Sequence, residues 1–410
     1  MSFSKPASLG VIACPGAEHF TNEVIGHLKR IYLRIFDKKA ERLSHRYSLE
    51  KSEIIRRINL ASDMRTSGSP PNAGTVDAYR PPDFKIPAAY TCFANGEVKA
   101  EIQRSVRGMN LYIVQDVENH TLVRVNSGKD EMKFSINDHI FSLLVTIDAA
   151  IQGGAKEVTV VLPVYPYSRQ HKKKGREGLT AARFGQMLEN LGVKRLITLD
   201  IHSKEISNSF NHLRLENLHA SYQILKKLRE CIDLKTEDIV VVSPDTGAVD
   251  RNKFYAESLH KPLALLYKER DYSKLSQNAA DNNITTIKLL GDVKGKTVIM
   301  ADDMLGTGGT LIKAMELLKK KGAEKIICVV SLPFFTGSAR EHFETAYQKG
   351  LFFRVLGTNA VYHDDTLLAR EWYISANVTN LFARTIQRLH HNLSLSPLLD
   401  NRQIIHKLLD

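Results

Sequence analysis

The pattern of hydrophobic and polar positions alternates between short apolar runs and longer helical patterns. Apolar runs typical of buried strands occur at 9–13, 111–115, 157–162, 195–199, 239–242, 263–267, 298–301 and 326–330. Helical periodicity appears at 22–36, 137–151, 180–191 and 311–320. Buried runs that alternate with helices are typical of parallel α/β layers. Because the alternation begins again after residues 215–225, the sequence predicts an α/β fold with two domains of similar build.

Three segments depart from this rhythm. Residues 62–88 are rich in Ser, Gly and Pro and predict a loop, and the polar residues 118–133 predict a second one. Residues 378–389 have the pattern of an amphipathic helix, which we expect to pack back on the first domain. We therefore divide the chain into a first domain at 1–218, with an insert at about 40–90, a second domain at 219–375, and a C-terminal helical region at 376–410.

Composition and charge narrow the possible partners. The 410 residues are 43% hydrophobic and 25% charged, as in ordinary globular proteins, and the net charge of +12 favours anionic partners. Aromatic residues are not interleaved with a basic stripe, so we expect phosphorylated small molecules and no nucleic acid. Four scattered cysteines, no signal-peptide pattern and no apolar window of about 18 residues lead us to expect a cytoplasmic protein without membrane contact.

Residues 297–311 carry the strongest chemical signal. An apolar run ends in Asp302 and Asp303, and a Gly-Thr turn at 307–310 then opens a helical pattern. Glycines, hydroxyls and a helix N-terminus together form a phosphate nest, and a carboxylate pair suits sugar hydroxyls or Mg²⁺ carried by a phosphate. A βα turn that binds nothing would explain the acids poorly, because adjacent buried carboxylates repel. This segment therefore predicts a site for a phosphorylated sugar.

This run resembles the phosphoribosyl-pyrophosphate loop of type I phosphoribosyltransferases and ribose-phosphate pyrophosphokinases. That loop usually reads Asp-Asp-x-x-Asp-Thr-Gly-Gly-Thr, and Gly306 stands in place of its third acid. The run Ser243 to Arg251 resembles the Ser-Pro-Asp-x-Gly-Gly-x-x-Arg segment of the pyrophosphokinases, with Ala248 at the second glycine. The resemblance implies that ribose phosphate is held by Asp245, Asp302, Asp303, Gly306, Thr307, Gly308, Gly309 and Thr310.

Two further segments resemble nucleotide-binding parts of the pyrophosphokinases. The run Tyr165 to Lys174 is similar to their Pro-Tyr-Ala-Arg-Gln-Asp-Lys-Lys segment, with His171 in place of Asp, although its lysines alone suggest a solvated basic loop. The run Phe93 to Glu97, followed by Val-Arg-Gly, resembles the hairpin that in this family reaches the site of a neighbouring subunit. The resemblance implies that ATP is bound by Phe93, Asn95, Glu97, Arg169 and Gln170, and that the protein is a homo-oligomer.

The remaining motifs concern metal and catalysis. Asp200 and His202 lie two apart at a strand end, where we expect them to point to one side and to be able to ligate a divalent ion. They resemble the family's Met-Asp-Leu-His segment, which implies a Mg²⁺ site. Lys268 and Arg270 precede the polar tract 271–283 and read alone as a surface charge cluster. They resemble the family's catalytic Lys-Glu-Arg loop, which implies that they stabilise the transition state.

These motifs follow the order of the ribose-phosphate pyrophosphokinase family from about residue 93 to 310, so the chain resembles a member with insertions. The resemblance implies two type I phosphoribosyltransferase-like domains, each a mainly parallel sheet flanked by helices, in a dimer-based oligomer of up to six subunits. It implies transfer of pyrophosphate from MgATP to the 1-hydroxyl of ribose 5-phosphate, giving 5-phosphoribosyl 1-pyrophosphate and AMP. Two alternatives stay open here: a phosphoribosyltransferase that consumes this product, and a catalytically impaired regulatory homologue, which Gly306 and His171 favour.

Overall fold

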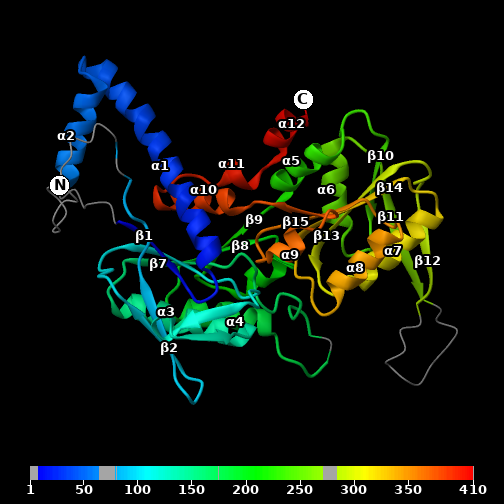
Figure 1. Ribbon diagram of the computed structural model, residues 1–410, viewed down its shortest axis with the longest axis horizontal. Coiled ribbons are helices and arrows are strands. Elements are labelled where there is room, and N and C mark those ends of the chain that lie inside the picture. The colour runs from blue at the N-terminus through cyan, green and yellow to red at the C-terminus, as the bar shows by residue number, and fades with distance from the viewer. Residues whose placement is uncertain (1–7, 64–78, 80, 174, 271–283, 410) are drawn as a thin grey trace.

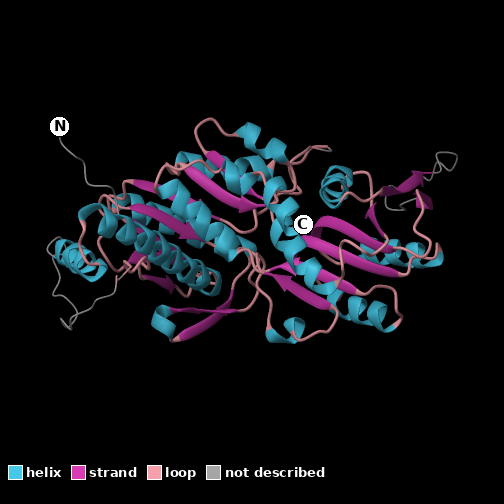
Figure 2. Cartoon of the chain, turned by 90° about the horizontal axis from the view of Figure 1, so that it is seen from above, coloured by secondary structure: helices cyan, strands magenta, loops and turns pink. Residues whose placement is uncertain are grey.

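Two β-sheets of mainly parallel strands, one from each half of the chain, form the body of the protein (Figure 1). The computed structural model describes residues 8–63, 79, 81–173, 175–270 and 284–409, and at 60–63, 268–270 and 284–286 it describes the backbone only. Seen from above, the two sheets lie side by side along the long axis, with helices around both (Figure 2). The predicted α/β fold with parallel sheets flanked by helices is confirmed.

The first sheet contains five parallel strands in the order β1-β4-β7-β8-β9. These strands are β1 (Leu9–Ala13), β4 (Asn110–Val114), β7 (Glu157–Val161), β8 (Arg195–Leu199) and β9 (Arg214–Leu218). Figure 1 shows α1 (Glu18–Tyr47) and α10 (Thr379–His390) on one side of this sheet, and α3 (Ile136–Gln152) and α4 (Thr180–Asn190) on the other. The ring of Phe382 meets the ring of Phe20 edge-on, so the helix near the C-terminus packs on the first helix of the chain.

The second sheet has seven strands in the order β12-β11-β10-β13-β14-β15-β16, and only β12 runs antiparallel to its neighbour. They are β10 (Ile239–Ser243), β11 (Leu263–Arg270), β12 (Ile284–Leu290), β13 (Thr297–Leu305), β14 (Lys325–Pro333), β15 (Arg354–Thr358) and β16 (Tyr373–Ala376). The chain leaves β10 toward β11 and returns on its other side as β13. This reversal is a topological switch point, where α/β sheets bind ligands beyond the carboxyl ends of their strands.

Side-chain alternation explains how the second sheet is covered. Ile239 and Val241 belong to the core shared with the first half, whereas Val240 and Val242 belong to a separate core on the other face. This division follows because successive residues of a strand point to opposite faces. The inner face packs on α5 (Ser221–Cys231) and α6 (Val249–Leu259), and the outer face packs on α7 (Gly309–Lys320) and α8 (Ala339–Gln348).

The remaining elements join or extend these layers. Three short helices are α9 (Asp365–Leu368), α11 (Ser396–Leu399) and α12 (Arg402–Leu409). Arg229 of α5 donates a hydrogen bond to the carbonyl of Leu408 at 2.7 Å, so the last helix lies against the second half. β9 ends at Leu218 in the first sheet and α5, which begins at Ser221, packs under the second. The domain division after residue 218 stays a prediction.

The structure contains helices and strands that were not predicted from the sequence. Residues 118–133 include the antiparallel pair β5 (Leu122–Val125) and β6 (Asp130–Lys133), because Val123 and Val125 bury their side chains against Phe134 in a small core. The helix expected to end at residue 36 continues to Tyr47 and is followed by α2 (Lys51–Asp63). A second antiparallel pair, β2 (Ala88–Cys92) with β3 (Val98–Ile102), follows the insert.

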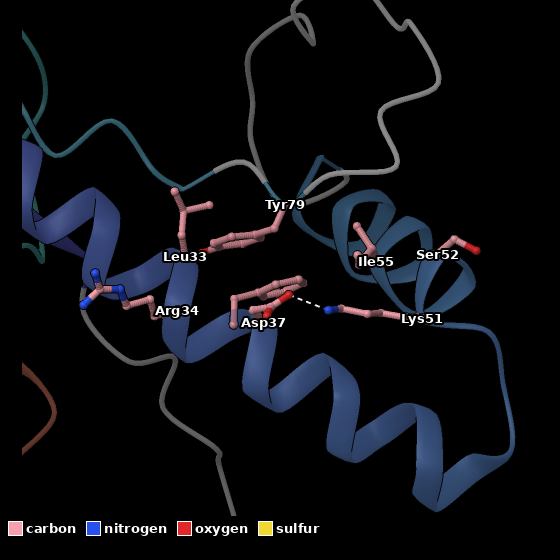
Figure 3. Close-up of a pocket in the computed structure, with 8 residues that line it drawn as sticks. Leu33, Arg34, Asp37, Lys51, Ser52, Ile55 and Tyr79 are labelled. Carbon is pink, nitrogen blue, oxygen red and sulfur yellow. Dashed lines mark hydrogen bonds and ion pairs between the residues drawn. The ribbon is translucent and has the colours of Figure 1, made fainter.

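The insert therefore begins as a helical hairpin, which projects from the body of the protein (Figure 1). Ala40 of α1 packs with Ile54 and Ile55 of α2 in a small core. Lys51 forms an ion pair with Asp37 at 2.5 Å. A cavity of about 590 Å³ opens between the two helices, with Tyr79 stacked on Phe36 at a ring distance of 3.8 Å (Figure 3). In the predicted loop at 62–88, residues 62 and 63 form the end of α2. Residues 64–78 and 80 lie outside the described residues.

Candidate active site

The carboxylate pair lies inside the second half of β13. The expected strand end at residue 301 is wrong, because β14 continues the parallel pairing, with Asp302 opposite Val330 and Met304 opposite Leu332. The neighbour on the other side, β10, pairs only as far as Ile299. Asp302 and Asp303 therefore stand at the switch point, beside the end of β10 and Asp245, which lies two residues beyond that strand.

The loop after β13 has the geometry that a phosphate nest requires. Gly308 has a φ of +74° and is the N-cap of α7. A Cβ at Gly308 would also overlap the ring of Phe343, so only glycine fits there without strain. Thr307, Gly309 and Thr310 are exposed. The first backbone N–H groups of a helix have no intrahelical partner, so this exposed end can receive a phosphate.

The two carboxylates differ in charge. Burial raises the pKa of Asp302 to about 7, and the negative charge of Asp303 adds to this rise. Burial acts in the same direction on Asp303, but the hydrogen bond and charge of His202, with the charge of Arg251, outweigh it and lower the pKa of Asp303. Near neutral pH one acid of the pair is therefore ionised and the other is close to its midpoint.

Residues from the first sheet complete the site. His202, after β8, contacts Asp303 through Nδ1 and Oδ2 at 2.5 Å. The ring of His171 meets the ring of His202 edge-on at 5.3 Å. Arg169 lies beside Gly306, since a Cβ at Gly306 would be 3.8 Å from a terminal guanidinium nitrogen. The structure thus brings together motifs from both halves of the chain and places a histidine where the related segment has an acid.

Asp200 does not share the environment of His202. We expected the two side chains to point to one side of a strand, but β8 ends at Leu199 and Asp200 adopts a φ of +41°, so the strand alternation stops before them. Asp200 is 5% exposed and accepts hydrogen bonds from His219 and Ser331. Burial alone would raise its pKa, but Arg251 at 3.5 Å, together with His219 and Ser331, holds the pKa of Asp200 well below its usual range.

Two other residues of the predicted site, Asp245 and Gln170, lie at turns of the chain. Asp245 caps the turn before α6, because its Oδ1 accepts from the N–H groups of Gly247 and Ala248 at 2.9 and 3.0 Å. The exposed Gln170 follows Tyr167, whose φ of +56° turns the chain.

Two further predicted sets lie on the β2–β3 hairpin and on β11. Phe93, Asn95 and Glu97 form the tip of the β2–β3 hairpin, which projects from the lower edge of the molecule in Figure 1. Phe93 is 48% exposed there. Lys268 and Arg270 lie on β11, but their side chains, and the tract 271–283, fall outside the described residues.

Sequence reasoning missed three partners of the acids: Arg251, His219 and Ser331. Arg251 ends the run Ser243 to Arg251, and the sequence does not show that this half-buried arginine lies beside a carboxylate. Ser331 lies within the apolar strand β14, where a single polar residue gave no distinct signal. His219 follows β9 at a strand end, and the same logic used for His202 could have found it.

The acidic and imidazole groups fit a magnesium ion that arrives with its substrate. Within the described residues, no cluster of three His, Cys, Asp or Glu side chains could hold a metal by itself. Mg²⁺ commonly uses one or two carboxylates together with substrate phosphates, and Asp302 and Asp303 offer that number.

No helix in the described part of the chain is long and apolar enough to cross a membrane.

The fold and site are typical of the phosphoribosyltransferase class: a glycine-threonine loop lies at the switch point of one mainly parallel sheet, and Arg169 and His202 approach it from the first half. The family model for the N-terminal domain of ribose phosphate pyrophosphokinase matches residues 85–192. The phosphoribosyl transferase domain model matches residues 213–367.

Named relatives agree with these matches. Ribose-phosphate pyrophosphokinase 2 of Schizosaccharomyces pombe is 33% identical over 75% of this chain and 87% of its own length. Ribose-phosphate pyrophosphokinase A of Dictyostelium discoideum is 32% identical over the same shares. The chain belongs to the ribose-phosphate pyrophosphokinase family.

A solved structure supports the fold. The crystal structure of phosphoribosylpyrophosphate synthetase from Mycobacterium smegmatis aligns with a TM-score of 0.67 over 94% of this chain and 99% of that one. Its sequence identity is 24%. Both halves of the chain and the arrangement of their sheets therefore match a known two-sheet architecture. The first family model begins at residue 85, after the helical hairpin of α1 and α2.

Proposed function

We propose that this chain transfers a pyrophosphoryl group from MgATP to the 1-hydroxyl of ribose 5-phosphate, giving 5-phosphoribosyl 1-pyrophosphate and AMP. The observation that carries the proposal is the contact between His202 and Asp303, which joins the nucleotide motif of one half to the ribose-phosphate motif of the other. A transfer between two phosphorylated substrates needs both motifs in one site. A phosphoribosyltransferase would need only the second, and the chain's relatives are named for the transfer itself.

The sugar phosphate binds along the end of β13 in this proposal. Backbone N–H groups and hydroxyls of residues 307–310 hold the 5-phosphate at the start of α7. Asp302 and Asp303 accept hydrogen bonds from ribose hydroxyls, and Asp245 stands on the neighbouring strand end. Gly306 contributes its backbone, and Arg169 lies next to it. The 1-hydroxyl then faces the residues of the first half.

The nucleotide binds on the side of the first half of the chain, opposite the loop at 307–310. Arg169 and Gln170 hold its phosphate oxygens, because a guanidinium and an amide donate to them well. His202 and the acid pair hold the Mg²⁺ that ATP brings, and bound Mg²⁺ neutralises charge on the phosphates. The exposed tip with Phe93, Asn95 and Glu97 holds the adenine of a neighbouring copy, so we propose a homo-oligomer built from dimers.

All four cysteines are free thiols, in keeping with a cytoplasmic enzyme.

Catalysis in this proposal is alignment together with charge neutralisation. The oxygen of the 1-hydroxyl attacks the β-phosphorus of ATP and its proton passes to solvent. The bond from that phosphorus to the α,β-bridging oxygen breaks, and AMP leaves with that oxygen. Holding both substrates in line supplies much of the rate, and cations stabilise the non-bridging oxygens as charge spreads over them. Lys268 and Arg270 supply those cations from the end of β11. No covalent enzyme intermediate is needed.

The test is a direct assay of the purified protein with ribose 5-phosphate, ATP and Mg²⁺. AMP and 5-phosphoribosyl 1-pyrophosphate are quantified in the same samples, with inorganic phosphate varied. We expect equal amounts of both products, and none after chelation of the metal. A folded protein that makes neither product at any phosphate concentration, but binds both substrates, would overturn the proposal in favour of the regulatory alternative.

A further inference from the structure

We propose that Asp200 is a positioning residue that fastens the end of β8 onto the second sheet, and that it is not a metal ligand. The family resemblance gave Asp200 and His202 one shared role. The structure gives them different partners: His202 faces Asp303, and Asp200 faces His219, Ser331 and Arg251. This inference rests on the proposed function, because it concerns the alignment of that site.

The first argument is the number of donors around the carboxylate. An ionised carboxylate offers about four lone-pair sites. Oδ1 of Asp200 receives His219 Nδ1 at 2.9 Å and lies 3.5 Å from the Arg251 guanidinium. Oδ2 receives the Ser331 hydroxyl at 2.6 Å and the N–H of Ala220 at 3.1 Å. Three hydrogen-bond donors and the Arg251 ion pair therefore already surround a side chain that is almost fully buried, and a cation would have to displace one of them.

The second argument is the origin of these donors. His219 and Ala220 follow β9 in the first sheet, whereas Arg251 belongs to α6 and Ser331 to β14 of the second half. Arg251 also donates to the Ser331 hydroxyl at 3.2 Å, so the two donors from the second half hold each other. A single carboxylate thus connects the ends of two strands of one sheet to a strand and a helix of the other half.

The third argument is what this connection controls. His202 is two residues beyond Asp200, and its contact with Asp303 crosses between the halves at the proposed reaction site. Arg251, which Asp200 holds, also lowers the pKa of Asp303 by its charge. Weakening the connection would displace His202 and redistribute the charge of Arg251. Displacements of about 1 Å can lower the rate of an aligned reaction by up to about a hundredfold.

The experiment separates a positioning role from a metal-ligand role. The variants are Asp200→Asn and Ser331→Ala, because the second removes a donor to Asp200 without changing any proposed ligand. Ser258→Ala is the matched control, since Ser258 is also buried, at 6% exposure, but lies at the far end of α6. Each variant is assayed for kcat and for KM of both substrates. The affinity for Mn²⁺ is measured by electron paramagnetic resonance with a non-hydrolysable ATP analogue.

We expect Ser331→Ala and Asp200→Asn each to lower kcat roughly tenfold or more while the Mn²⁺ affinity stays within about twofold of wild type. The double variant should be little worse than the worse single variant, because both remove one connection. Ser258→Ala should match wild type. Loss of Mn²⁺ affinity by about tenfold in Asp200→Asn, with an unchanged kcat in Ser331→Ala, would overturn the proposal and make Asp200 a ligand.

A second pair of variants guards against failure to fold. His219 is half-exposed, so His219→Ala should fold, and we expect it to lower kcat with unchanged Mn²⁺ affinity. His219→Asn keeps an N–H donor and should restore most of kcat. Equal loss in both variants would contradict the positioning role. A wild-type protein without activity would refute the proposed function, whereas the Mn²⁺ measurement would still tell whether Asp200 is a ligand.

Discussion

The carboxyl ends of β8 and β13 offer a direct comparison of buried acids. Both carry aspartates where the two halves of the chain meet, and burial favours the neutral form at each. The pKa of Asp200 nevertheless lies well below its usual range, whereas the pKa of Asp302 is raised to about 7. The difference is in the neighbours. Asp200 has Arg251, His219 and Ser331, and Asp302 has a second carboxylate.

This contrast separates an acid that holds the fold from an acid that awaits a ligand. The charge of Asp200 is balanced by the protein itself, so nothing further is required to keep it ionised. The charge on the Asp302 and Asp303 pair is balanced only in part, by His202 and Arg251. A sugar hydroxyl or a magnesium ion would complete that balance. A perturbed pKa is a stronger sign of a functional site when the neighbouring groups do not balance the charge of the acid. It is a weaker sign when they do balance that charge.

The largest effect is expected within the acid pair itself. Asp303→Asn removes the charged member that His202 contacts at 2.5 Å, whereas Asp302→Asn replaces an acid that is partly protonated near neutral pH. We expect Asp303→Asn to lower kcat/KM for ribose 5-phosphate by about a hundredfold, since bonds to charged groups contribute about 1.5–3 kcal/mol. Asp302→Asn should cost roughly tenfold. Steady-state kinetics at pH 7 measures both.

Equal losses in the two variants would remove the distinction between these acids. The control for folding is the near-UV circular dichroism of each variant, because Asn is nearly isosteric with Asp. A larger loss in Asp302→Asn than in Asp303→Asn would mean that ligand binding exchanges their charge states. The contrast between Asp200 and the acid pair would then apply only to the ligand-free protein.

The glycines after β13 provide the next largest effect. Gly308→Ala places a Cβ against Phe343 at a φ of +74°, so we expect a loss of about 1–3 kcal/mol in unfolding free energy and weaker binding of ribose 5-phosphate. Gly306→Ala meets no atom closer than 3.5 Å, and it should be neutral or stabilise by about 0.5 kcal/mol. Urea unfolding and isothermal titration with ribose 5-phosphate measure the pair. Similar stability of the two variants would show that the loop shifts freely.

Much of this organisation could be predicted from the sequence, and the exceptions share a cause. Apolar runs predicted eight of the twelve strands described in the two main sheets, because buried parallel strands are continuously apolar. The runs did not predict β9, β12, β15 and β16, and three of these are edge strands. The motif at 302–310 was readable because its residues are adjacent. The partners of Asp200 were not readable, because Arg251 and Ser331 reach it only through tertiary packing. The segment 118–133, which we expected to be a loop, is another exception. It forms a hairpin because its short alternating strands have a small core of their own.

The pH dependence of stability should have opposite signs at the two strand ends. The folded protein binds the Asp302 proton up to about pH 7, while the unfolded chain releases it near pH 4. Stability from Asp302 is therefore present below about pH 4 and is lost as pH rises to 7. Asp302→Asn should thus gain on wild type by about 1–3 kcal/mol between pH 4.5 and 7.5. Asp200 stabilises above its ordinary pKa and loses this contribution only in strong acid.

Denaturant unfolding of ligand-free, metal-free protein at pH 4.5, 6 and 7.5 measures this difference. The stability of Asp302→Asn is compared with wild type at each pH, so that other titrating groups cancel. A difference that stays constant with pH would show that the pKa of Asp302 is not raised. A difference that shrinks toward pH 7.5 would show that its pKa is lowered like that of Asp200.

The smallest effect is expected at a third strand end. Asp116 follows β4 and is 3% exposed, and burial raises its pKa to about 7, as for Asp302. Asp116 accepts from the backbone N–H of Glu118 at 3.0 Å, as Asp302 accepts from that of Asp303 at 2.8 Å, and an Asn oxygen can also do this. We expect Asp116→Asn to keep kcat within about twofold and to be as stable as wild type, or more so, at pH 8, since it removes a buried charge. A tenfold loss of kcat in a stably folded Asp116→Asn variant would contradict this. The raised pKa alone would then mark a functional acid, and the contrast between β8 and β13 would lose its explanation in the neighbouring groups.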